Sequence, residues 1–220
     1  MFRYGRVEFT WLGHDCFKIK GEGLTLYFDP FELADGEPAD LILITHEHFD
    51  HLSPSDVAKI STEETSIVTI PQAASNLSGV KAKEIVKVSP GSRVTVKGVE
   101  IEAVPAYNVN KFRAPGVPFH PKEEGKVGFL VNLAGVKTYH AGDTDVIPEM
   151  EELQPDVALL PVSGTYVMTA EEAAEALKLI KPKVAIPMHY GAIVGSKADA
   201  QRFQALAPKE VQVVILEKEA

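Results

Sequence analysis

The chain has 220 residues, 45% of them hydrophobic, which suffices for one sizeable core but not for two independent large domains. Its net charge of −9 argues against a general attraction to nucleic acid or to anionic membranes, without excluding a local basic pocket. The single cysteine excludes an intramolecular disulfide, and no run fits a signal peptide or the roughly 20 apolar residues of a membrane span, so we expect a soluble cytoplasmic protein.

Short β-strands are predicted for most of the first hundred residues. The runs separated by glycine-containing turns indicate an antiparallel meander over 7–12, 16–20 and 24–29. The uninterrupted apolar run 41–44 is typical of a strand buried on both faces. A capping-box pattern then predicts the start of a helix at Ser53, Pro54 and Asp56. The other strands of this half are expected at 66–70 and within 84–106.

The pattern changes in the second half. The stretch 105–126 contains four prolines and no periodicity, which indicates a long loop of the kind that is usually functional or disordered. A hairpin around Ala134 and Gly135 follows, and strands then alternate with helices. The expected strands are 157–162, 184–188 and 211–217, and the expected helices are 169–181 and 196–206. One continuous domain over 1–220, an α/β sandwich in layers, accounts for this order.

Three of the seven histidines, and an aspartate, lie within six positions of the segment THEHFDH. His46, His48, Asp50 and His51 directly follow the buried strand 41–44. Neutral imidazole and carboxylate are ligands of zinc, iron and manganese. Four such side chains in one strand-to-helix loop are suited to two metal ions side by side, and a histidine-rich surface turn is the less favoured alternative.

Further candidate ligands come at the ends of later predicted strands. The segment YHAGDTD supplies His140, Asp143 and Asp145, and IPMHYG supplies His189. Each follows an apolar run and lies beside a glycine, which is how a chain brings a side chain to the edge of a sheet and then turns away.

These segments together resemble the metallo-β-lactamase superfamily. THEHFDH is similar to its H-x-H-x-D-H signature, HAGDTD to its later aspartate motif and PMHYG to its last histidine. Within the superfamily, WLGHDCF, YFDPF and PVSGTYVMTAEEA resemble small single-domain metal-dependent hydrolases related to ascorbate-6-phosphate lactonase. The resemblance spans nearly the whole chain and does not specify a substrate.

The resemblance implies a four-layer αβ/βα sandwich, in which two facing mixed sheets carry helices outside and one or two divalent metal ions at one edge. Zinc is the expected metal, with manganese or iron as alternatives. The first ion would be bound by His46 and His48, and the second by Asp50, His51 and His189, with Asp143 as a bridge. Residues implied near the site are Asp29, which would orient a ligand histidine, and His14, which either lies beside the site or holds a loop by a hydrogen bond.

One departure affects the first ion. The superfamily normally supplies a third histidine from the strand end that reads VPAYN here, where this chain has Asn108. Three outcomes are open. Asn108 binds the first metal weakly, another residue replaces the missing histidine, or the first site is weak and the protein works with one metal. We favour replacement by His120, from FHPK, and we expect His140 to support a ligand rather than to bind metal.

Two metals that share a water would generate a hydroxide nucleophile near neutral pH, with Asp50 as general base. The long loop carries a basic patch of Lys111, Arg113, Lys122 and Lys126 that indicates recognition of a phosphate or carboxylate, although ordinary solvated charge is an alternative. Tyr166 in GTY is expected to contact substrate.

We therefore predict a metal-dependent hydrolase of a small ester, lactone or phosphoester, and the basic patch leaves open an anionic substrate. The alternatives are a non-catalytic or mononuclear metal-binding protein of the same fold and, less favoured, a nuclease, because 220 residues leave no room for the cap domain of such enzymes. We expect no nucleic-acid or membrane partner, and the sequence leaves open whether the chain forms a homo-oligomer.

Overall fold

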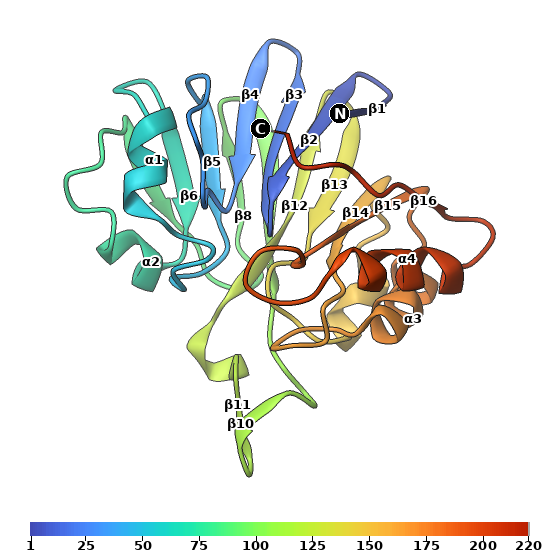
Figure 1. Ribbon diagram of the computed structural model, residues 1–220. Helices are drawn as coiled ribbons and strands as arrows, with labels where there is room; N and C mark the ends of the chain where they lie inside the picture. The colour runs from blue at the N-terminus through green and yellow to red at the C-terminus, as the bar shows by residue number, and fades with distance from the viewer. Residues whose placement is uncertain (220) are drawn as a thin grey trace.

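The computed structural model describes residues 1–219, which form two seven-stranded mixed sheets packed face to face (Figure 1). The first sheet has the strands in chain order from β1 to β7. These strands are β1 (Phe2–Tyr4), β2 (Val7–Gly13), β3 (Cys16–Gly21), β4 (Leu24–Phe28), β5 (Leu41–Ile44), β6 (Ser66–Thr69) and β7 (Glu84–Lys87). β1 to β4 are antiparallel neighbours, and β4 to β7 are parallel.

The second sheet has the order β16-β15-β14-β13-β12-β9-β8 and the same mixture of directions. Its strands are β8 (Arg93–Val96), β9 (Val99–Pro105), β12 (Val127–Leu133), β13 (Val136–His140), β14 (Val157–Pro161), β15 (Val184–Met188) and β16 (Gln212–Val213). β8 to β13 pair antiparallel, and β13 to β16 pair parallel. The parallel halves matter for function, because side chains that follow parallel strands gather at one edge of a sheet.

Helices lie outside both sheets. The first sheet is flanked by α1 (Pro54–Ile60) and α2 (Pro71–Ser75), and the second by α3 (Ala170–Ile180) and α4 (Lys197–Leu206) (Figure 1). Two 3₁₀ turns, η1 (Lys122–Glu124) and η2 (Pro148–Glu152), complete the elements outside the sheets. The predicted sandwich of two facing mixed sheets with outer helices is confirmed.

The starts of the helices follow the sequence signals with one correction. Thr169 and Glu172 form the complete reciprocal capping box that was predicted for α3. At α1 the Ser53 side chain accepts a hydrogen bond from the Asp56 backbone N–H, but the carboxylate of Asp56 pairs with Lys59 at 2.7 Å instead of closing the box. A neighbouring cation therefore competes successfully for the capping carboxylate.

Two predicted segments differ from the structure. The last strand was expected over 211–217, but β16 ends at Val213, and the chain then crosses to the first sheet, where the Glu219 N–H donates to the carbonyl of Trp11. The loop 105–126 contains a small hairpin, β10 (Phe112–Ala114) with β11 (Val117–Pro118), which projects from the body of the molecule (Figure 1).

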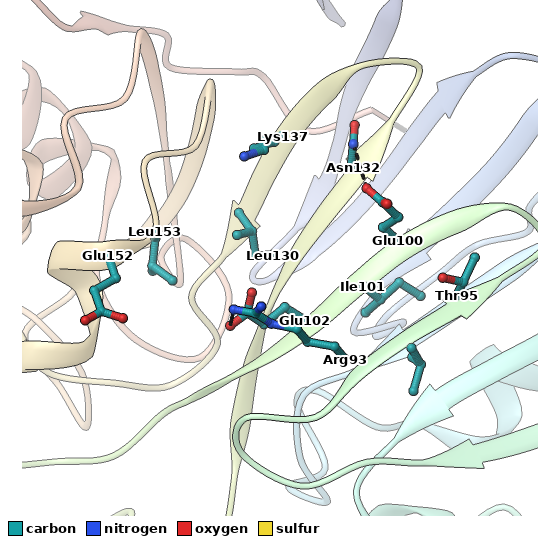
Figure 2. Close-up of a pocket in the computed structure, with 11 residues that line it drawn as sticks. Arg93, Thr95, Glu100, Ile101, Glu102, Leu130, Asn132, Lys137, Glu152 and Leu153 are labelled. Atoms are coloured by element: carbon teal, nitrogen blue, oxygen red, sulfur yellow. Dashed lines mark hydrogen bonds and ion pairs between the residues drawn. The ribbon is translucent and has the colours of Figure 1, made fainter.

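An open groove of about 490 Å³ lies on the outer face of β8, β9 and β12 (Figure 2). Some of its polar lining is paired, because Arg93 binds Glu102 at 3.1 Å and Asn132 donates to Glu100 at 2.9 Å. The residues that line this groove include no histidine and none of the predicted site residues. Within residues 1–219, no helix is long and apolar enough to cross a membrane.

Candidate metal centre

The predicted ligands follow the carboxyl ends of parallel strands. His46, His48, Asp50 and His51 come directly after β5. On the second sheet, Asp143 follows β13 and His189 follows β15. Because the two sheets face each other, these loops meet across the sandwich, which is the convergence that the sequence predicted. His14, from the turn between β2 and β3, and His120, from the long loop, also reach this edge.

A first group consists of His46, His48, His120 and Asp143, whose ligand atoms all lie within 4.8 Å of one another. Nε2 of His120 lies 3.3 Å from Nδ1 of His48 and 3.2 Å from Oδ2 of Asp143. His46 Nε2 lies 3.9 Å from the same oxygen. His120 thus stands where the superfamily resemblance lacked a third imidazole.

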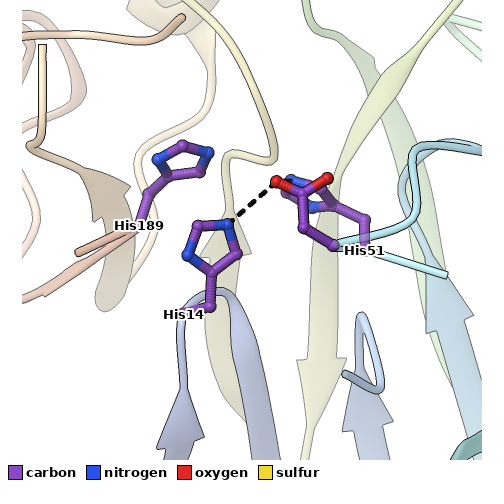
Figure 3. A group of neighbouring side chains, drawn as sticks. His14, His51 and His189 are labelled. Carbon is purple, nitrogen blue, oxygen red and sulfur yellow. Dashed lines mark hydrogen bonds and ion pairs between the residues drawn. The ribbon is translucent and has the colours of Figure 1, made fainter. Parts of the chain in front are cut away.

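A second group consists of His14, Asp50, His51 and His189, again within 4.8 Å (Figure 3). Asp50 Oδ2 lies 3.1 Å from His14 Nε2, the dashed contact in Figure 3, and 3.9 Å from His51 Nε2. His14 was expected either near the site or as a loop support, and the structure places its ring 4.2 Å from that of His189.

Asp143 lies between the two groups. Its Oδ1 lies 3.1 Å from His51 Nε2 and 3.2 Å from His189 Nε2, whereas its Oδ2 faces His120 and His46. One carboxylate therefore presents an oxygen to each group, the geometry expected of a bridge.

The histidines are oriented by their second ring nitrogens. Nδ1 of His51 lies 2.8 Å from Asp29 Oδ2, and Nδ1 of His189 lies 3.1 Å from Ser163 Oγ. Nδ1 of His46 lies 3.0 Å from Thr45 Oγ1, whose hydroxyl in turn donates to Asp29 at 2.7 Å. Oxygen partners on Nδ1 leave Nε2 free to bind a metal, so Asp29 has the orienting geometry that the resemblance implied.

The residues fit divalent cations. Nε2 of His46, His51 and His189 and Oδ1 of Asp143 are buried and lack a hydrogen-bond partner, which would be costly without another ligand. For a tetrahedral ion with bonds of about 2.0–2.1 Å, two ligand atoms stand about 3.3 Å apart. The contacts of 3.1–3.3 Å among His48, His120, Asp143, His51 and His189 match this spacing.

The electrostatics of the groups are tightly linked. Burial lowers the pKa of His189, but the charges of Asp143 and Asp15 outweigh it and raise that pKa to about 9. The pKa of His51 is likewise raised well above its usual range by Asp143 and Asp29, against the effect of burial. Burial holds the pKa of His46 well below its usual range.

The pKa values of the carboxylates Asp143 and Asp50 are lowered. Burial alone would raise the pKa of Asp143, but His51 and His189 hold it well below its usual range. At Asp50, the hydrogen bond from His14 and the charge of His51 outweigh burial and lower the pKa to about 2. Both carboxylates are therefore ionised at neutral pH, as metal ligands must be.

Four residues with a left-handed backbone lie at this edge. His14, Asp29, Tyr166 and His189 all have positive φ, between 41° and 68°. Such conformations are uncommon for residues other than glycine and cost on the order of 1–3 kcal/mol each unless the surroundings impose them. Six other residues of the described chain share this conformation in other turns, so it supports a functional role here only together with the ligand geometry.

Asn108 does not face the metal-binding groups. Its Oδ1 accepts hydrogen bonds from both the backbone N–H and the Nδ1 of His120, at 2.9 and 2.8 Å, and its Nδ2 donates to the carbonyl of Tyr166 at 2.8 Å. This corrects its interpretation as a weak ligand, because every polar atom of its amide is committed to holding His120 and the Tyr166 turn.

His140 contacts the turn between β2 and β3. Its Nε2 donates to the carbonyl of Asp15 at 2.9 Å, and its ring stacks on Phe28 at 4.8 Å. It belongs to neither group, and its hydrogen bond to Asp15 supports the turn that carries His14.

Sequence reasoning gave no role to Asp15, Thr45 or Ser163. Asp15 is fully buried, both of its carboxylate oxygens lack a hydrogen-bond partner, and it forms an alternative group with His51, Asp143 and His189. Its position next to His14 was the available signal. Thr45 and Ser163 contact His46 and His189, and no spacing in the sequence reveals these contacts.

The basic patch of the long loop is largely neutralised. Lys111 lies 2.6 Å from Glu172 and 3.4 Å from Asp145, whose other oxygen also accepts the N–H groups of Val109 and Asn110. Lys122 lies 2.8 Å from Glu149. These pairs favour the alternative in which the charges of Lys111 and Lys122 stabilise the loop.

Lys126 is also paired with carboxylates, since its ammonium lies 2.7 Å from Glu47 and 2.8 Å from Glu124. Arg113 is exposed on the hairpin, and Tyr166 is 37% exposed beside the site.

Comparison with known proteins identifies the family. A model of the beta-lactamase superfamily domain matches residues 8–189. The chain belongs to the metallo-β-lactamase superfamily. It is 36% identical to a UPF0173 metal-dependent hydrolase of Thermoplasma acidophilum, with 91% of each chain covered, and 37% identical to one of Pyrococcus furiosus, with 96% of each covered.

The fold agrees with solved members of this superfamily. A crystal structure of a protein from Parabacteroides distasonis, 32% identical, superposes with a TM-score of 0.82 over 97% of this chain and 94% of that one. The superfamily resemblance and the fold predicted from it are confirmed, and the chain is a metal-dependent hydrolase.

Proposed function

We propose that the chain hydrolyses a small ester, lactone or phosphoester with two divalent cations held by its two histidine groups. The observation that carries this proposal is the set of buried, unpartnered ligand atoms on both sides of Asp143. The first cation would be held by His46, His48 and His120, the second by Asp50, His51 and His189, and Asp143 would bridge them.

Zinc is the metal that this donor set favours, since it combines several imidazoles with carboxylate and no thiolate, and manganese or iron can use the same ligands. When bound, such cations lower the pKa of water toward 7 and polarise the attacked carbonyl or phosphoryl oxygen.

The protein's own groups would handle the proton. Asp50 is ionised, and its Oδ2 accepts a hydrogen bond from His14 Nε2 at 3.1 Å. A carboxylate with a pKa of about 2 is a weak base, so we assign Asp50 chiefly to orienting the attacking water and receiving its proton only briefly. Hydrolysis consumes one water, and its proton ends on the leaving oxygen.

The test is removal and return of the metal. Protein stripped with a chelator, then supplied separately with zinc, manganese or iron, should be assayed on p-nitrophenyl acetate, an aliphatic lactone and bis(p-nitrophenyl) phosphate. We expect at least one activity to disappear on stripping and to return with metal. Equal hydrolysis by the stripped protein, or no hydrolysis of any of the three by the metal-loaded protein, would refute the proposal.

A further inference from the structure

Most of the exposed apolar side chains lie on the loops that carry or adjoin the histidine groups. In residues 1–219, eight large hydrophobic side chains are exposed by 37% or more. Met1, at the terminus, and Leu206, on α4, lie elsewhere. The other six come from the loops that carry or adjoin the metal-binding residues, and we call them the apolar collar: Phe49, Val109, Phe112, Val117, Tyr166 and Ile193.

Aromatic pairs connect the collar to both groups. Phe49 packs edge-to-face on Phe31 at 6.0 Å, and Phe31 lies 6.0 Å from the ring of His14. On the other side, Tyr166 packs on Phe119 at 4.7 Å. The carbonyl of Tyr166 also accepts from Asn108, the residue that holds His120. Phe49 and Tyr166 are therefore linked by contacts to residues of the candidate metal centre.

Binding of a charged substrate at this surface is less favoured. Three of the four basic side chains of the adjoining loop, Lys111, Lys122 and Lys126, are paired with carboxylates at 2.6–2.8 Å. A charged substrate would therefore meet lysines whose charge is already largely balanced by carboxylates. An exposed apolar surface next to a reactive centre is, in contrast, available without such a cost and usually marks a binding site.

We propose that the apolar collar binds the hydrocarbon or aromatic part of an uncharged ester or lactone whose carbonyl enters the metal centre. This inference rests on the proposed hydrolase function and narrows it, because phosphoesters are disfavoured. It also revises the expectation of an anionic substrate. A second copy of the chain on the same surface is the competing occupant.

The first test compares kcat/KM for p-nitrophenyl octanoate and acetate. The metal-loaded protein should prefer the octanoate by about tenfold or more, because even partial burial of six extra methylenes favours it. Phe49→Ser and Tyr166→Asn should each reduce this ratio about threefold or more; asparagine is chosen because it tolerates the φ of +68° at that position. Leu206→Ser, a matched exposed position on α4, should leave the ratio unchanged.

The second test separates this inference from the function on which it rests. Calorimetry should measure binding of octanohydroxamate and acetohydroxamate, which need no hydrolysis, to the metal-loaded protein. Tighter binding of octanohydroxamate by about tenfold, lost in Phe49→Ser, supports the collar even if no ester is hydrolysed, in which case only the hydrolase proposal fails.

Equal affinities, together with equal hydrolysis of the two esters, overturn the collar while leaving the hydrolase proposal intact. A change from dimer to monomer in Phe49→Ser, measured by light scattering with an unchanged ester ratio, would likewise overturn it and assign the surface to self-association.

Discussion

Asn108 Oδ1 accepts two hydrogen bonds from His120, one from the backbone N–H at 2.9 Å and one from Nδ1 at 2.8 Å. Asn108 occupies the strand-end position where the superfamily normally supplies a ligand histidine. The Asn108 amide therefore holds the imidazole of His120, which lies twelve residues further along the chain. The hydrogen bond to Nδ1 fixes the tautomer in which Nε2 of His120 faces Asp143.

Replacing Asn108 by alanine should weaken metal binding at the first group about 10- to 100-fold, because His120 loses the partner that orients its ring. His120→Ala should lose that metal altogether. Competition with a chromophoric chelator measures both. Asn132→Ala, whose amide lies on the outer face of the second sheet, should behave as the parent protein. Unchanged affinity in Asn108→Ala would show that His120 is not held in this way.

Asp29→Asn tests the orientation of His51. Asparagine keeps the size of the side chain and tolerates the φ of 41°, but it removes the charge that faces His51 Nδ1 at 2.8 Å. We expect a 10- to 100-fold loss of affinity for the second metal, measured by elemental analysis after dialysis at graded chelator concentrations. Asp35→Asn, at an exposed position, is the matched control. Full retention of both metals in Asp29→Asn would contradict the account.

The metal-free form should lose more stability than the metal-loaded form as pH rises. In the metal-free fold the pKa of His189 is raised to about 9, against about 6.5 when unfolded, so the folded state holds the extra proton between these values. The stabilisation is complete below pH 6.5 and is lost as pH rises toward 9, on the order of 3 kcal/mol. Metal requires neutral histidine, so its affinity should rise through the same window.

Thermal unfolding at pH 6.5, 7.5 and 9 checks this for both forms. The melting temperature should fall with pH without metal, and the added stabilisation by saturating zinc should increase with pH. Parallel slopes for the two forms would indicate that His189 is not a metal ligand.

Lys111→Met should act on stability and not on substrate affinity. The ammonium lies 14% exposed between Glu172 and the buried Asp145, so its removal leaves a buried carboxylate with fewer partners. We expect a loss of about 1–3 kcal/mol in the free energy of unfolding, measured in urea, with KM for a phosphodiester unchanged. A large increase in that KM with unchanged stability would restore the role in anion binding.

The sequence was most informative where short-range patterns determine structure. The apolar run 41–44 and the dense histidines after it predicted β5 and its metal-binding loop, because both signals are local. The role of Asn108 depends on side chains that meet only after folding, and so does the neutralisation of Lys111 by Glu172, 61 positions away. Asp15 was missed because it meets His51, which follows a different strand of the same sheet, only after folding.

The most direct measurement of the central claim is anomalous X-ray diffraction at the zinc edge from crystals of the zinc-loaded protein. The account predicts two peaks in each chain, one among His46, His48 and His120 and one among Asp50, His51 and His189, with Asp143 between them. Zinc found away from these residues, with full hydrolytic activity in protein free of metal at the histidine groups, would contradict it.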